Sequence, residues 1–234
     1  DFPSKNTFTW NGHFRDDLRR FWKGDKDTAW NMSDKIKGTP SIYKEDNIFP
    51  KSINFITSHD GFTLKDLVTF NRKHNFANRE QNRDGDNHNN SWNHGTEGPT
   101  TNLLINDLRK RQQKNLILSL LISKGVPMIL MGDEIGRSQG GNNNSWCQNN
   151  LLGWMNWEHG QQDLELLEYF KYVIKIRKKL INIFNPSFFP DNQTNENIPT
   201  YHWHGTKLDS PDWSSWSHTC LLYTSPSPRD FTES

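Results

Sequence analysis

Apolar positions along the chain form helical stripes and strand-like alternations that are separated by long polar stretches. In the segment HFRDDLRRFWKGD, four large apolar residues recur at a spacing that places them on one face of a helix: Phe14, Leu18, Phe21 and Trp22. Gly24 stands where this helix should end. From Asp25 to Pro50 the chain is polar and is broken up by glycine and proline, as in a connection between elements.

The segment SINFITSHDG alternates with a period near two, which predicts a strand. This strand runs directly into His59 and Asp60. An acid in that place is either the N-cap of the next helix or part of a reaction centre. Thr63 and Asp66 already have capping-box spacing for a short helix in TLKDLVTF. Asp60 is therefore freer to take part in chemistry.

A long helix and a second strand follow. The helix in LLINDLRKRQQKNLILSLLISKG carries an apolar stripe: Leu104, Leu108, Leu116, Leu120 and Leu121. Gly125 stands at the place of its C-cap. VPMILMGDE is a continuous apolar run, which predicts a fully buried strand ending in Asp133 and Glu134.

Both predicted strands end in acids, which indicates one shared site. Strands Ile53–Ser58 and Val126–Gly132 are joined by the helix Leu104–Lys124, and such a crossover makes neighbouring strands parallel. The active sites of parallel α/β proteins lie at the carboxyl ends of their strands. We therefore expect Asp60 and Asp133 on the same face of the sheet.

The end of the chain changes in character. An amphipathic helix follows an Asn-rich loop, and its predicted inner face comprises Leu167, Phe170, Ile174, Ile181 and Phe184. After Pro186 the segment IPTYHWHGTKLDSPDWSSWSH is aromatic and rich in turn residues, as in the first strands of a β-domain.

Metal sites are not predicted, nor is any cofactor. The stretch DGDNHNN resembles a calcium loop, but counted from Asp84 its sixth position is Asn89 instead of Gly, and its twelfth is Gly95 instead of Glu. The histidines lack helical ligand spacing and a cysteine partner, which argues against zinc. Cys147 and Cys220 cannot form a disulfide framework.

Composition narrows the class of protein further. Only 32% of the residues are hydrophobic and the mean hydropathy is −0.92, which indicates core elements joined by long polar loops, or a piece of a larger protein. The net charge of +1 does not predict nucleic acid or an anionic membrane as a partner. No apolar run approaches the length of a membrane span, and no signal peptide is visible.

Four strings carry a resemblance to a known family: INFITSHDGFTLKDLV, NRDGDNHNNSWNHGTEGPT, GVPMILMGDEIGRSQGGNNN and WHGTKLDSPDW. They resemble the isoamylase and glycogen-debranching branch of the α-amylase superfamily. The opening WNGHFRDDLRRFWKGD is similar to the segment between the fifth and sixth barrel strands of that family. The resemblance covers roughly residues 8–219.

This resemblance implies an α/β fold, the C-terminal part of a (β/α)8 TIM barrel followed by the start of a small β-sandwich. It implies hydrolysis of α-1,6 branch linkages in branched α-glucans such as glycogen and amylopectin. By the match, Asp60 is the third catalytic carboxylate, which stabilises the transition state, and His59 is a substrate-binding residue beside it.

The loop from Asn71 to Thr101 has almost no apolar periodicity, and loops of that length are usually functional or disordered. Its aromatic residues, glycines and charges favour an ordered loop that faces the substrate. If it lines a glucan cleft, Trp92 should stack on a sugar ring, while Arg83 and Asp84 should form hydrogen bonds with hydroxyls.

The resemblance also implies a domain division and some missing parts. Residues 1–185 should be the C-terminal portion of the catalytic barrel, 186–219 the start of the β-domain, and 220–234 a non-native tail. CLLYTSPSPRD resembles translated sequencing-adapter sequence, and the alternative is a divergent natural tail. The nucleophilic Asp and the acid Glu of the family have no matching motif here, so this fragment alone should be inactive.

Several alternatives stay open. The chain could belong to a non-catalytic glucan-binding subunit or to a glucanotransferase relative instead of a hydrolase. Homo-oligomers and hetero-oligomers with isoamylase subunits are both compatible with the sequence. We expect an intracellular location, in the plastid of a starch-making alga or plant and otherwise in the cytoplasm.

Overall fold

The computed structural model describes residues 7–43, 52–158, 161–180, 203–205 and 207–215. Within these ranges three short strands form one parallel sheet in the order β1 (Thr9–Trp10), β2 (Ser52–Phe55) and β3 (Val126–Met128). β2 is the middle strand, so the predicted parallel pairing of the two main strands is confirmed. Both are shorter than predicted, and β1 is a strand that the sequence pattern did not reveal.

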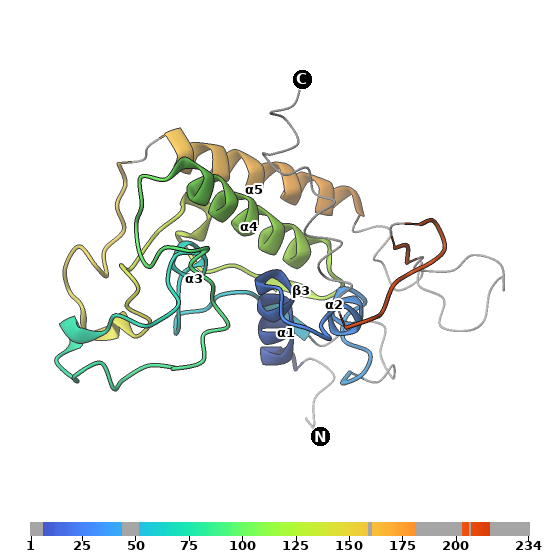
Figure 1. Cartoon of the computed structure of the whole chain (residues 1–234), viewed down its shortest axis with the longest axis horizontal. Coiled ribbons are helices and arrows are strands. Elements are labelled where there is room, and N and C mark those ends of the chain that lie inside the picture. The colour runs from blue at the N-terminus through green and yellow to red at the C-terminus, as the bar shows by residue number, and fades with distance from the viewer. Residues whose placement is uncertain (1–6, 44–51, 159–160, 181–202, 206, 216–234) are drawn as a thin grey trace.

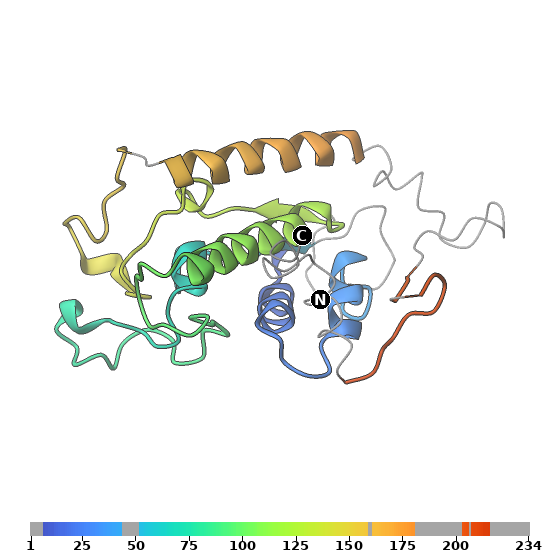
Figure 2. The ribbon, with the colours of Figure 1, turned by 45° about the horizontal axis from the view of Figure 1, so that its top comes forward.

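Helices make up most of the remaining regular structure: α1 (Gly12–Lys23), α2 (Ala29–Ile36), α3 (Leu64–Leu67), α4 (Leu103–Ile122) and α5 (Gln161–Leu180). Short 3-10 turns lie in the loops: η1 (Phe76–Asn78), η2 (Asp133–Ile135) and η3 (Ser145–Cys147). α4 connects the region of β2 to β3, and α5 lies beside α4 (Figures 1 and 2). The order of strand, helix and strand is the predicted crossover.

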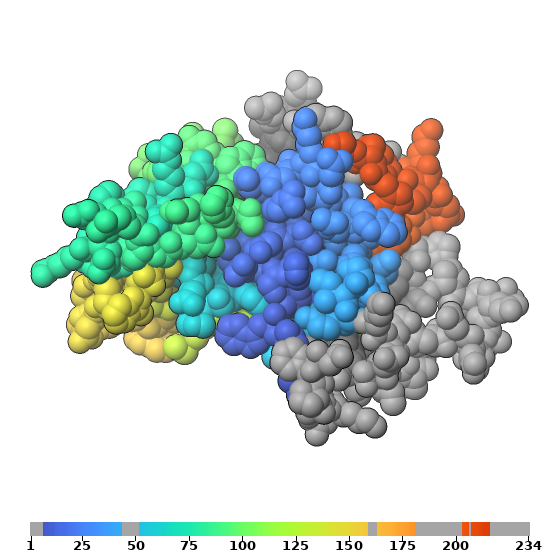
Figure 3. All heavy atoms as spheres, turned by 90° about the horizontal axis from the view of Figure 1, so that it is seen from below, coloured from blue at the N-terminus to red at the C-terminus, as the bar shows by residue number. Residues whose placement is uncertain are grey.

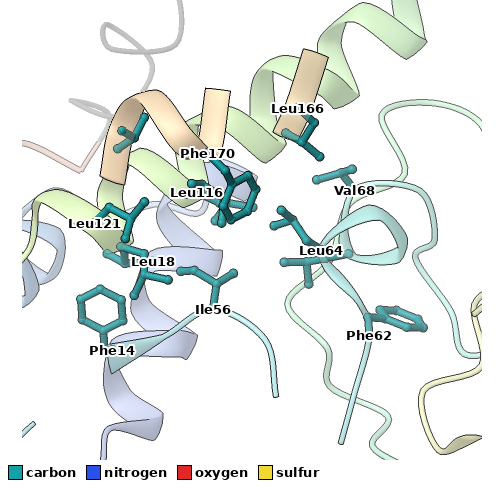
Figure 4. Packing of buried hydrophobic residues seen from close by; sticks show 14 of the residues in the cluster. Phe14, Leu18, Ile56, Phe62, Leu64, Val68, Leu116, Leu121, Leu166 and Phe170 are labelled. Carbon is teal, nitrogen blue, oxygen red and sulfur yellow. The ribbon is translucent and has the colours of Figure 1, made fainter. Parts of the chain in front are cut away.

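The hydrophobic core lies between the end of β2 and the helices. Phe14 of α1, Leu116 of α4 and Phe170 of α5 converge near Ile56, and all four are at most 3% exposed (Figure 4). Full burial of such side chains contributes about 1.5–3 kcal/mol each. This packing fixes the end of β2, from which the candidate site begins.

Helix ends follow the sequence signals in two places. The Asn11 side chain caps α1 by accepting a hydrogen bond from the Phe14 amide at 2.9 Å, and Gly24 ends the helix with a φ of 92°. Only glycine adopts that left-handed conformation without strain. Thr63 caps α3, as predicted, by accepting from the Asp66 amide at 3.1 Å.

Other sequence predictions for the helices were confirmed only in part. α2 lies within the polar stretch from Asp25 to Pro50, for which the sequence pattern predicted no helix. α4 ends at Ile122, so Gly125 is not its C-cap, and Leu104 is 67% exposed because the first turn of α4 extends beyond the core. On α5 the predicted Phe170 is buried, together with Leu166 and Val173, and the predicted Ile174 packs against this core. The predicted Ile181 and Phe184 lie outside the described residues.

β3 is less buried than its apolar sequence predicted. Val126 is 45% exposed and Met131, which follows the strand, is 71% exposed. The reason is that, in the described ranges, β3 pairs with β2 alone. A long apolar run predicts burial only where both neighbours of the strand are in place.

The predicted β-sandwich remains unconfirmed. Residues 203–205 and 207–215 contain one antiparallel bridge, between Lys207 and Ser210, and the tail 220–234 lies outside the described residues.

In the part of the chain that the structure describes, no helix has the length and apolar character of a membrane span.

Candidate active site at the strand ends

His59 and Asp60 lie in the turn between β2 and α3. Their side chains are 70% and 76% exposed, and the His59 Nε2 atom lies 3.2 Å from Asp60 Oδ2. The ring of Trp10, at the end of β1, meets the His59 ring edge-on at a centroid distance of 5.9 Å. An imidazole, a carboxylate and an indole therefore face solvent together beyond the carboxyl ends of two neighbouring strands.

Asp133, the acid after β3, has a different environment. It is 1% exposed. Its Oδ1 accepts a hydrogen bond from the Leu64 amide at 2.9 Å, and its Oδ2 accepts one from the Thr57 hydroxyl. The two strand-end acids thus follow parallel strands as predicted, but Asp60 faces solvent while Asp133 is buried and bonded to the turn that carries Asp60.

Further contacts hold the same turn. Arg19, a buried residue of α1, donates to the Ile56 carbonyl from Nε at 2.9 Å and from Nη2 at 2.6 Å. The Gly61 amide donates to the Asn143 carbonyl at 3.0 Å, and Gly61 has a φ of +91° that other residues rarely adopt. The backbone around His59 and Asp60 is therefore fixed from α1 and from the loop after β3.

Burial raises the pKa of Asp133 to about 7. The hydrogen bonds from Thr57 and Leu64 oppose this shift, and the charges of Glu134 and Asp66 add to it. Burial likewise raises the pKa of Asp66, which accepts hydrogen bonds from Ser138 and Gln139. Burial lowers the pKa of Arg19 to about 10, and the charge of Asp133 is among those that oppose this shift.

A pH dependence of stability follows from the raised pKa of Asp133. Between its ordinary pKa of 3.8 and about 7, folded Asp133 binds a proton that the unfolded chain has released, so its contribution to stability falls as pH rises. The test compares the full-length wild type with Asp133→Asn. We expect the difference between their free energies of unfolding, wild type minus variant, to decrease from pH 4 to 7 by at most about 1.4 kcal/mol per pH unit. Urea denaturation across this range measures the difference, and a constant difference would contradict the prediction.

The long loop 71–101 is ordered, and charged side chains hold its backbone. Lys73 Nζ donates to the carbonyls of Arg83, Asp84 and Gly85 at 3.2, 2.6 and 3.2 Å. Arg109 of α4 donates to the carbonyls of Gly98 and Asn93, each at 2.8 Å, and to that of Thr96. The prediction of an ordered loop is consistent with these anchors, and neither anchor was evident in the sequence.

The loop also packs against the loop after β3. Asn75 Nδ2 donates to Asn143 Oδ1 at 2.8 Å, and Asn78 Nδ2 donates to the Asn144 carbonyl at 2.9 Å. Both loops extend from the same end of the molecule (Figures 1 and 2). Because Asn143 also binds the Gly61 amide, this asparagine joins the two loops to the turn of His59 and Asp60.

Asp84 and Arg83, predicted to bind substrate, have different surroundings. Asp84 Oδ2 accepts hydrogen bonds from Asn78 at 2.7 Å and from Asn144 at 2.9 Å. Burial opposes ionisation of Asp84, but these bonds lower its pKa below the ordinary value. The Arg83 side chain is exposed, while its carbonyl accepts from Lys73. Asp84 thus has a structural role in the loop whatever else it binds.

Trp92 lies over the helices. It lines a small hollow with Trp22 of α1 and Gln112 of α4, and its ring packs on His94 at a centroid distance of 4.3 Å. Its side chain is 38% exposed. In the view from below, the loop lies beside α1, and α2 lies on the other side of α1 (Figure 3). Among the described residues that line this hollow, neither His59 nor Asp60 occurs.

The described residues contain no cluster of three or more His, Cys, Asp or Glu side chains that could hold a metal ion. The chemistry that the strand ends offer is that of one exposed carboxylate beside an imidazole and an indole. A carboxylate so placed can oppose positive charge on a bound molecule, and the rings can pack against a sugar.

Comparison with solved structures identifies the class of fold. The chain superposes on part of the pullulanase from Bacillus acidopullulyticus with a TM-score of 0.52 at 20% sequence identity, covering 73% of this chain and 18% of that one. The α/β arrangement described above is therefore a fold that also occurs in part of that pullulanase.

Sequence relatives identify a narrower group of proteins than the fold does. No protein-family model matches the chain. Isoamylase 1, chloroplastic, of Oryza sativa subsp. japonica is 42% identical over 216 residues, which are 92% of this chain and 26% of that protein. The glycogen operon protein GlgX homolog of Mycobacterium bovis is 39% identical over 227 residues, 94% of this chain and 31% of that protein. The glycogen debranching enzyme of Erwinia tasmaniensis is 39% identical over 213 residues, 89% of this chain and 31% of that enzyme.

These matches confirm the resemblance inferred from the motifs. The chain is homologous to a segment of the isoamylases and glycogen-debranching enzymes of the α-amylase family. It spans about a quarter to a third of the length of the curated relatives that it matches.

Proposed function

We propose that the chain is the C-terminal part of a debranching glycoside hydrolase that cleaves α-1,6 linkages in branched α-glucans. The observation that carries the proposal is the exposed His59–Asp60 pair at the carboxyl end of β2, in a chain about 40% identical to isoamylases and debranching enzymes. The three parallel strands would be the last three of a (β/α)8 barrel. The β-domain would begin after residue 185.

Asp60 is proposed as the carboxylate that stabilises the transition state, with His59 binding the same sugar. Retaining glycosidases pass through an oxocarbenium-like state and use a nucleophile and a proton donor about 5–5.5 Å apart. A further carboxylate opposes the developing positive charge. The high exposure of Asp60 suits this role, because the carboxylate is accessible to a bound glucan.

The loop 71–101 is proposed to contact the glucan beside this pair. Arg83 is exposed there and can donate to sugar hydroxyls, whereas Asp84 would have to contribute while keeping its bonds to Asn78 and Asn144. Trp92 would contact sugar from the hollow over α1 and α4. These three assignments belong to the proposal and are secondary to Asp60 and His59.

A non-catalytic glucan-binding subunit of isoamylase type is the alternative. The exposed Asp60 favours the enzyme, because a binding subunit does not require a carboxylate at the position of the developing charge. For an organism that makes starch, the chloroplastic rice relative supports a location in the plastid. Assembly with isoamylase subunits is compatible with either function.

Activity of the full-length protein tests the proposal. We expect it to carry an Asp nucleophile and a Glu acid upstream of residue 1, and to release linear chains from amylopectin or glycogen. The measurement is the increase in reducing ends, followed by chain-length analysis of the products. Binding to glucan without release of chains, in a protein that lacks those two acids, would establish the alternative.

A further inference from the structure

We propose that Asp133 is a positioning residue for the catalytic turn: its buried carboxylate holds both ends of the segment that presents His59 and Asp60. This inference rests on the proposed function, in which Asp60 acts on the glucan. Asp133 itself does not touch the substrate, because it is 1% exposed.

The geometry gives this role to Asp133. Thr57 precedes the turn and Leu64 follows it, and the two oxygens of one carboxylate accept one hydrogen bond from each. The six residues between them, Ser58 to Thr63, include His59 and Asp60. Asp133 therefore closes the turn at its base, from the end of the neighbouring strand.

The other contacts of the turn make Asp133 the bridge between its two sides. The Ser58 hydroxyl donates to the Asp60 carbonyl at 3.1 Å, and the Gly61 amide is held by Asn143, but neither bond connects Thr57 to Leu64. Arg19 fixes the strand before the turn. Without the Asp133 carboxylate, the start and the end of the turn would lose their common partner.

The amide of asparagine could replace this carboxylate. Its oxygen can accept from the Leu64 amide while its NH2 group donates to the Thr57 hydroxyl oxygen, so both connections are kept. Alanine keeps neither. Comparing the two variants separates the hydrogen bonds of Asp133 from its charge.

The experiment measures kcat, KM and melting temperature of the full-length enzyme on amylopectin for Asp133→Ala, Asp133→Asn and Glu134→Gln. A displacement of about 1 Å at a reacting group can cost about 100-fold in rate. We expect Asp133→Ala to lower kcat by about 10- to 100-fold per folded molecule with little change in KM. Asp133→Asn should stay within about threefold of wild type. Glu134→Gln, at the adjacent acid, is the control and should resemble wild type.

Two further measurements cover the case in which Asp133→Ala does not fold. Thr57→Val has nearly the same shape and removes only the hydroxyl, so it should lower kcat in the same direction by a smaller factor. Hydrogen–deuterium exchange should show faster exchange over residues 57–64 in Asp133→Ala or Thr57→Val than in Glu134→Gln.

The outcomes separate the two proposals. Unchanged kcat and unchanged exchange in Asp133→Ala and Thr57→Val would overturn the positioning role, as would equal losses of kcat in Asp133→Asn and Asp133→Ala. An inactive wild type would overturn the proposed hydrolase function. In that case the exchange measurement still decides whether Asp133 holds the turn.

Discussion

Replacing Asp60 by asparagine in the full-length enzyme is expected to lower kcat for cleavage of α-1,6 linkages by about 10²- to 10³-fold, or roughly 3–4 kcal/mol of barrier. Asparagine keeps the shape of the side chain and removes its negative charge. That charge would oppose the positive charge that develops on the sugar. The loss should therefore appear in kcat and far less in KM.

The melting temperature of Asp60→Asn should not change. The helix after the turn is capped by Thr63, and the only side-chain contact described for the Asp60 carboxylate is with the exposed His59. Asp209→Asn is a matched control, because Asp209 also forms an exposed pair with a histidine, His204, at 3.3 Å. Near-normal turnover of Asp60→Asn would contradict the catalytic role of Asp60.

Replacing Arg109 by alanine is expected to give the largest loss of stability. Arg109 is 5% exposed and donates to three carbonyls of the loop 71–101. The bond to Gly98 is buried, and the bonds to Asn93 and Thr96 are partly buried. A buried carbonyl left without a donor costs about 1–3 kcal/mol, so we expect the free energy of unfolding to fall by about that amount. Lysine cannot replace the guanidinium here, because it lacks the planar fork that reaches several acceptors.

Urea denaturation and limited trypsin digestion of the full-length protein test this expectation. The loop contains trypsin sites at Arg72, Lys73, Arg79 and Arg83, which should be cut faster in Arg109→Ala than in wild type. Arg111→Ala, at a partly exposed position of the same helix, is the control. Equal digestion of the two variants would show that Arg109 does not hold the loop.

Local signals in the sequence predicted the parts of the fold that depend on neighbouring residues. The end of α1 at Gly24 and the cap of α3 at Thr63 were both confirmed, because each is decided within one turn of helix. The parallel pairing of β2 and β3 was confirmed because a long helix between two apolar strands permits few topologies.

Features that depend on distant contacts were not predictable in the same way. β1 has only two residues, too few for a periodic pattern, and it is a strand because β2 pairs with it. The sequence placed Asp60 and Asp133 at equivalent strand ends, but only the packing shows which is buried. A buried arginine such as Arg19 has the same sequence signature as a solvated one on a helix.

The bonds of Lys73 and Arg109 have a consequence for how this family of loops can diverge. Both cations bind main-chain oxygens, and every residue type supplies the same oxygen. At Arg83, whose carbonyl Lys73 binds, a change of side chain leaves the bond in place, unlike at Asp84, whose side chain itself forms bonds. A substitution at a residue that gives only its main-chain oxygen to Lys73 or Arg109 therefore leaves these anchors of the loop intact.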